Sequence, residues 1–268
     1  MKIGARPLLI VHPDERFVEK VRAAAGNEYT FQALPDWPTL IEVIRDAPAS
    51  ALVIVDPFDD TGPRGIAPGL NELMLQYPSI PIVAVVEIGP GSADALVKLG
   101  KQGIVEIVTI GHDDTREALR RRFQNAQGRP LKALMETVLP ADLPGRARAI
   151  MDAAAQVVSA AGHGRDLAKT LGLSRRTLLR WTERASIPPP RRLLAWMRIL
   201  QAAALLDDPG RTVYSVARAC GYSSDSGLRR VTMKFLKSSP TEMRGRGAFA
   251  RASKGFLTEL EKHRTDGS

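Results

Sequence analysis

Arginine side chains recur at helical spacing between residues 175 and 184, and their chemistry suits a nucleic acid. In a helix that begins at residue 175, Arg176, Leu179 and Arg180 lie three and four residues apart and share one face. A guanidinium group donates two hydrogen bonds to a guanine edge in the major groove of DNA. We therefore predict that these three residues read the bases of double-stranded DNA.

The residues around this face are predicted to contact the phosphate backbone. Arg175 and Arg184 flank it, and an ionic contact to phosphate orients a protein on the duplex without reading its sequence. Ser174 directly precedes the helix, so we expect it to cap the helix and to lie beside the same backbone.

A helix, a glycine turn and a second helix position these side chains. Residues 166–171 predict a supporting helix, and Gly172 permits the positive backbone angle of a tight turn. Residues 175–184 then form the second helix, with Leu178 and Trp181 expected to point inward. We call residues 166–184 the first motif.

The same pattern returns forty-nine residues later, where residues 216–223 align with residues 167–174. Thr212 is the expected N-cap of a supporting helix over residues 213–220, and Gly221 takes the turn position. Either Ser223 or Ser224 is expected to cap the helix that follows and reaches residue 235. We call residues 213–235 the second motif.

The second helix of the second motif is predicted to bury Leu228, Val231 and Phe235. Its predicted base-reading residues are Asp225, Ser226, Arg229 and Arg230, and its predicted phosphate contacts are Ser224 and Lys234. Gly227 is a poor helix former in the first turn. The second motif is therefore expected to be the less base-specific of the two.

Between the motifs, Pro190 opens a predicted helix over residues 191–206. Its sixteen residues span roughly 24 Å, which suits two helices held about one DNA turn apart. With the closing segment KFLKSSPTEMR, this arrangement resembles the AraC/XylS family of transcription regulators over residues 145–246. The segment has Ser239 where the family usually has glycine before Pro240. The resemblance implies two helix-turn-helix motifs in successive major grooves, with RNA polymerase as a candidate partner.

The N-terminal part alternates apolar runs with segments of helical periodicity. Runs such as LVIV and IVAVV are apolar on both faces, as parallel strands covered by helices must be. Five such pairs predict a doubly wound α/β domain with a parallel five-stranded sheet. The runs are residues 7–11, 29–34, 51–56, 81–86 and 104–110, and the helical segments lie near 14–25, 37–47, 66–77, 91–102 and 114–127.

Acidic side chains lie where these strands are expected to end, which is where function gathers in such a sheet. Asp14 follows the first run and Asp56 ends the third. Over residues 6–128 the chain resembles the receiver domain of bacterial response regulators. In that family an aspartate at the end of the third strand accepts a phosphoryl group, so the resemblance implies Asp56 as the phosphoacceptor.

Other receiver positions differ in this sequence. His12 and Pro13 stand in place of the acidic pair that holds Mg²⁺, Val86 in place of Thr or Ser, and Ile110 in place of lysine. Phosphoryl transfer to a carboxylate needs a metal and a cation beside the transferred oxygens. We therefore predict a pseudo-receiver for phosphorylation-independent regulation or dimerisation, and phosphorylation at Asp56 is the alternative. Asp14, Asp59 and Asp60 are interpreted as loop and first-turn acids and not as metal ligands.

Charge separates the two halves of the chain. Residues 1–128 hold 13 Lys and Arg against 17 Asp and Glu, whereas residues 129–268 hold 25 against 12. A basic half joined to a slightly acidic one indicates a polyanion-binding domain attached to a domain with another task. The predicted organisation is a receiver-like domain at 6–128, a connector at 129–144, the DNA-binding domain at 145–246 and a C-terminal tail at 247–268 that forms one more helix.

The remaining composition excludes several function classes. The four histidines are scattered without ligand spacing, and no nucleophile–base pair or cofactor motif is present, so we expect no metal, no cofactor and no enzyme activity. The single cysteine, Cys220, is interpreted as a packed small residue. Without an apolar run of membrane-spanning length or a signal peptide, a cytoplasmic protein is expected. A homodimer through the N-terminal domain is a candidate assembly, and a nonspecific architectural DNA-binding protein is a further alternative.

Overall fold

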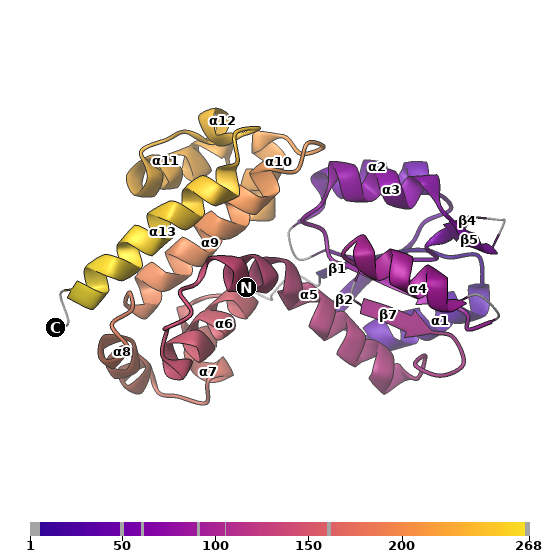
Figure 1. Cartoon of the computed structure of the whole chain (residues 1–268), viewed down its shortest axis with the longest axis horizontal. Coiled ribbons are helices and arrows are strands. Elements are labelled where there is room, and N and C mark those ends of the chain that lie inside the picture. The colour runs from indigo at the N-terminus through magenta and orange to yellow at the C-terminus, as the bar shows by residue number, and fades with distance from the viewer. Residues whose placement is uncertain are drawn as a thin grey trace. The chain divides into compact units, whose positions relative to one another are not determined.

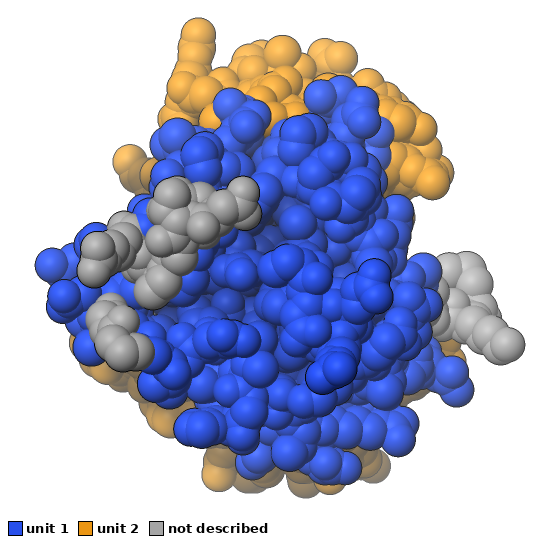
Figure 2. Space-filling model, turned by 90° about the vertical axis from the view of Figure 1, so that its right-hand side faces the viewer, with its two compact units in different colours: residues 1–129 blue, residues 130–268 orange. Residues whose placement is uncertain are grey.

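The computed structural model describes residues 6–48, 51–59, 62–89, 92–104, 106–159 and 162–265 (Figure 1). The side chains of residues 59, 62–64, 127–130, 132–134 and 137 are outside this description. The chain divides into two compact units, residues 1–129 and residues 130–268, which Figure 2 colours separately. Within the described residues, no helix combines the length and the apolar character needed to cross a membrane.

Unit 1 is built on a parallel five-stranded sheet. Its strands are β1 (Arg6–Val11), β2 (Tyr29–Ala33), β3 (Leu52–Val55), β6 (Ile82–Val86) and β7 (Glu106–Thr109). They lie in the order β2-β1-β3-β6-β7, and every neighbouring pair is parallel. This is the strand order of flavodoxin-like doubly wound sheets. The predicted fold class of the N-terminal half is confirmed.

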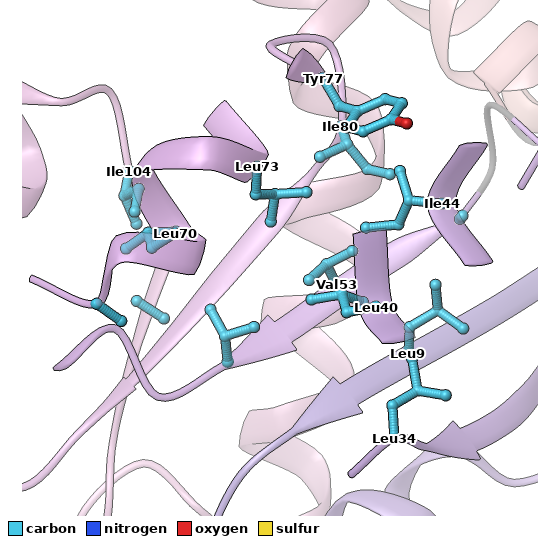
Figure 3. Close-up of a cluster of buried hydrophobic side chains, with 14 of the residues drawn as sticks. Leu9, Leu34, Leu40, Ile44, Val53, Leu70, Leu73, Tyr77, Ile80 and Ile104 are labelled. Carbon is cyan, nitrogen blue, oxygen red and sulfur yellow. The ribbon is translucent and has the colours of Figure 1, made fainter. Parts of the chain in front are cut away.

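Alternate residues of each strand enter two separate cores, because successive side chains of a strand point to opposite faces. Leu9 and Val53 belong to the core under α2 and α3 (Figure 3), whereas Leu8 and Ile54 belong to the core under α1 and α5. The helices that cover the sheet are α1 (Glu15–Ala25), α2 (Trp37–Asp46), α3 (Pro68–Gln76), α4 (Ser92–Lys101) and α5 (Arg116–Val138). Burial on both faces explains why β3 (LVIV) and β6 (IVAVV) are continuously apolar.

Unit 1 differs from the sequence-based expectation in two places. A short hairpin of β4 (Phe58–Asp59) and β5 (Gly62–Ile66) follows β3, although glycine and proline make the segment look like a loop. The second difference is the length of α5: the sequence predicts a helical segment near 114–127 followed by a connector from residue 129, whereas α5 continues through Pro130 to Val138. Leu131 and Met135 are buried, and this packing outweighs the helix-breaking tendency of the Gly-Arg-Pro sequence.

Unit 2 is a bundle of helices around a central, largely buried helix, α9 (Pro190–Leu206). It contacts α6, α7, α8, α10, α12 and α13. The surrounding helices are α6 (Gly145–Ser159), α7 (Gly164–Thr170), α8 (Arg175–Arg184), α10 (Val213–Ala219), α11 (Asp225–Leu236), α12 (Pro240–Met243) and α13 (Ala248–Thr265). Proline at the first position of α9 costs no helix hydrogen bond, which explains why the helix starts there.

The C-terminal segment is helical and belongs to the core of unit 2. The carboxylate of Asp207 accepts hydrogen bonds from the backbone N–H groups of Ala248 (2.7 Å) and Phe249 (2.8 Å), and so caps α13. Phe256 is fully buried, with its ring centroid 5.7 Å from that of Trp196 in α9. The unit that contains both motifs therefore includes α13.

Candidate nucleic-acid interface

Both motifs turn at a glycine with a positive backbone angle. Gly172 has φ of 65° and Gly221 has φ of 81°. A Cβ atom at either position would meet no heavy atom within 4 Å. The glycines are therefore explained by the left-handed conformation of the turn and not by lack of space.

Side-chain caps begin one helix of each motif at the predicted residue: Ser174 before α8 and Thr212 before α10. The Ser174 hydroxyl accepts a hydrogen bond from the backbone N–H of Thr177 at 3.1 Å, which caps α8. Thr212 and Ser215 form a reciprocal capping box at the start of α10, with both bonds 3.0 Å long.

The second motif has a longer turn than the first. Residues 171–174 separate α7 from α8, whereas residues 220–224 separate α10 from α11. Ser224, and not Ser223, is the N-cap residue of α11, although its hydroxyl lies 2.7 Å from the Ser226 hydroxyl instead of capping the helix. The turn of the second motif is one residue longer, so the offset between the motifs changes from forty-nine residues before the turn to fifty after it. Each position of α8 therefore corresponds to the α11 position fifty residues later, as Ser174 does to Ser224.

The buried face of each second helix consists of a leucine and a threonine. Leu178 and Thr182 are 2% and 0% exposed, and the corresponding Leu228 and Thr232 are 0% and 1% exposed. Each threonine hydroxyl donates to the backbone carbonyl three residues earlier, at 2.8 Å in α8 and 3.1 Å in α11. This bond removes the cost of burying the hydroxyl group, so a polar residue can serve as a core residue.

The sequence-based prediction of this face was only partly right. Leu178 and Leu228 are buried, but Trp181, Val231 and Phe235 are half-buried. The Trp181 ring lies under the Arg146 guanidinium group, 4.7 Å from its centroid. Thr182 and Thr232 are polar, so a search for apolar residues does not predict that they are buried. Each lies four residues after a buried leucine, however, and this spacing places it on the same helix face.

Opposite the buried side, α8 presents the predicted basic face to solvent. Arg176, Leu179 and Arg180 are exposed, as are the flanking Arg175 and Arg184. In α11 the predicted residues Asp225, Ser226, Arg229, Arg230 and Lys234 are also exposed, whereas Ser224 is half-buried. Within unit 2, Figure 1 shows α8 and α11 on opposite sides of α9. The structure thus brings the predicted residues into two separate exposed groups.

Arg184 also borders a cavity of about 240 Å³ in unit 2. The cavity is formed by the segment before α6, the end of α8 and the end of α13, where Arg264 pairs with Asp142 at 2.6 Å. Arg184 therefore lies at the edge of the basic face, while Arg176 and Arg180 lie within it.

Asp56 and His12 lie at the carboxyl edge of the unit 1 sheet, directly after β3 and β1. The Asp56 carboxylate accepts a hydrogen bond from the backbone N–H of Phe58 at 3.0 Å, and burial raises the pKa of Asp56. Burial also lowers the pKa of His12, whose Nδ1 accepts from the backbone N–H of Asp14 at 3.0 Å. An imidazole carries no negative charge in either protonation state, so His12 does not supply the carboxylate that Mg²⁺ prefers as a ligand.

The other acids of this edge have local roles or lie outside the description. The Asp14 carboxylate caps α1 by accepting from the backbone N–H of Arg16 at 2.8 Å. Asp60 and the side chain of Asp59 are outside the described residues. In the described part of the chain, no three His, Cys, Asp or Glu side chains come together as a metal site.

Comparison with known families identifies the two motifs. Residues 167–246 match a family model described as a helix-turn-helix domain. These residues form an AraC-type helix-turn-helix domain. The chain is accordingly a DNA-binding transcription regulator. No curated protein and no solved structure matches the chain significantly.

Proposed function

We propose that this regulator binds specific DNA sequences by placing α8 and α11 in successive major grooves. The observation that carries this proposal is that each helix buries a leucine and a threonine and exposes arginines on the other side. The seventeen residues of α9 span about 26 Å, so this buried helix is long enough to hold two recognition helices on one face of the duplex.

The exposed residues divide by their position on each helix. Residues in the first two turns face the bases, because the N-terminal part of a recognition helix enters the groove. They are Arg176, Leu179 and Arg180 in α8, and Asp225, Ser226, Arg229 and Arg230 in α11. The flanking residues contact phosphates. They are Ser174, Arg175 and Arg184 for the first motif, and Ser224 and Lys234 for the second.

The first motif is the stronger reader in this proposal. At the first two positions, α8 carries Arg175 and Arg176, whereas α11 carries Asp225 and Ser226. A carboxylate beside the phosphate backbone is repelled, and a serine makes fewer hydrogen bonds to a base than an arginine. Discrimination among sequences should therefore come mainly from the part of the operator that α8 contacts.

We further propose that unit 1 regulates DNA binding without phosphorylation and without catalysing a reaction. Three features of unit 1 support this proposal. The Asp56 carboxylate already accepts a hydrogen bond from the backbone of Phe58, burial lowers the pKa of His12, and Ile110 is aliphatic. Incubation with a small phosphodonor and Mg²⁺ tests it by intact-mass measurement. An acid-labile adduct that is absent from Asp56→Asn would show instead a response regulator activated at Asp56.

Selection of bound DNA from a random pool tests the DNA-reading proposal. Specific recognition predicts an enriched sequence with two conserved blocks about one helical turn apart. An architectural protein would retain DNA in a salt-dependent manner without enriching any sequence. Analytical ultracentrifugation of the full chain, with and without the selected site, determines whether it binds as a homodimer. Mixing with RNA polymerase on the same site tests the further partner.

A further inference from the structure

An apolar side chain interrupts the basic face of α8. Leu179 is 42% exposed, and Arg176 and Arg180 lie beside it on the same face. In the described part of the chain, Met233 is the other exposed large hydrophobic residue on these two helices, and it lies in the last turn of α11. Leu179 is therefore the apolar side chain placed where the first turns of a recognition helix meet bases.

Packing within unit 2 does not explain this leucine. The inward face of α8 is already provided by Leu178 and Thr182. An exposed leucine gains free energy only when a partner removes its surface from water, at about 0.8 kcal/mol per methyl-sized group. A partner with an apolar group at this position of the groove would supply that gain.

The major groove offers one such group in unmodified DNA. Base edges present hydrogen-bond donors and acceptors there, and thymine adds an apolar C5-methyl group. Arginine matches guanine and leucine does not. We infer that Leu179 reads the 5-methyl group of a thymine that neighbours a guanine contacted by Arg176 or Arg180. This inference rests on the proposed function of α8.

The second motif lacks an equivalent contact. The fifth residue of α11, which corresponds to Leu179, is Arg229. The two halves of the operator are therefore chemically unlike: the half read by α8 depends on a thymine methyl group at the fifth helix position, and the half read by α11 does not.

Deoxyuridine substitution tests this contact at the level of one methyl group. The full chain is first used to select its best site from a random pool. Each thymine of that site is then replaced in turn by deoxyuridine, which lacks only the methyl group. The wild-type protein should lose about four-fold in affinity at one position, the equivalent of about 0.8 kcal/mol. Leu179→Ala should show no further loss there, and Leu179→Met should retain the dependence.

Arg229→Ala is the matched control, because it removes the corresponding side chain of the other helix. This variant should bind more weakly and still lose affinity at the same thymine. Retained dependence in Leu179→Ala, or indifference of the wild type to deoxyuridine at every thymine, would refute the inference while leaving specific binding established. Failure of the wild type to enrich any sequence would overturn the proposed function and this inference with it.

Discussion

Replacing Arg180 by alanine should weaken DNA recognition without weakening the fold. Arg180 is exposed, and no ion pair in the described part of the chain involves it. Surface substitutions of this kind change the free energy of unfolding by about 0.5 kcal/mol or less. Leu178 and Thr182, which hold α8 to unit 2, remain in place. Urea unfolding of wild type and variant should therefore nearly coincide.

The loss of binding can be estimated from the chemistry of the contact. A bidentate arginine–guanine pair contributes about 1–3 kcal/mol of discrimination, which corresponds to an increase in Kd of about 5- to 150-fold at the best site. Affinity for random DNA should change much less, because that binding depends on phosphate contacts. The variant should therefore lose preference at a single base pair of the operator.

Arg184→Ala provides the comparison, since Arg184 lies at the edge of the same helix. Removing a phosphate contact should weaken binding to all sequences similarly and reduce the slope of log K against log salt by about 1. Fluorescence anisotropy at several salt concentrations, with the selected site and its single base-pair variants, measures both effects. If Arg180→Ala weakens specific and random binding equally, the assignment of Arg180 to base reading is wrong.

Three further outcomes follow from the structure. Gly172→Ala should destabilise unit 2 by about 1–2 kcal/mol in urea unfolding, because alanine disfavours positive φ; Gly227→Ala should not, and an equal loss in both would contradict this reason. Arg192 holds the pKa of Glu259 below its ordinary value of 4.5, so the pair stabilises the fold above that pH and the contribution disappears as pH falls through the lower folded-state pKa. Acid unfolding of Glu259→Gln should accordingly be less steep than that of wild type. Cys220 is half-buried, and burial of its thiol raises its pKa to about 12. Alkylation of the native protein at neutral pH should therefore be slower than alkylation of the unfolded chain, and equal rates would contradict this expectation.

Local signals in the sequence were sufficient where a single interaction determines the structure. A serine or threonine before a helix accepts the backbone N–H groups of its first turn, and Ser174 and Thr212 both do so. A glycine at a tight turn avoids the penalty of positive φ, as at Gly172. The continuous apolar runs likewise identified the strands of the parallel sheet, because both of its faces are covered.

Long-range packing decided the features that were predicted incorrectly. The sequence predicts a helical segment near 114–127 and a connector from residue 129, but α5 runs without a break to Val138, and its residues Leu131 and Met135 are buried. The β4–β5 hairpin depends on pairing between segments whose glycines and prolines have low strand propensity. Neither result can be read from local propensity, because the free energy of burial depends on which distant residues come together.

The amino-acid sequence by itself determined the two helix-turn-helix motifs, their arginine-bearing faces and the doubly wound class of the N-terminal half, since helical periodicity and strand hydrophobicity are local patterns. Only the tertiary structure decided that Thr182 and Thr232 complete the buried faces, and that α13 joins the core around α9. It also left Leu179 exposed among arginines. Exposure is a property of the packed unit: the same leucine would be a core residue if a neighbouring helix covered it.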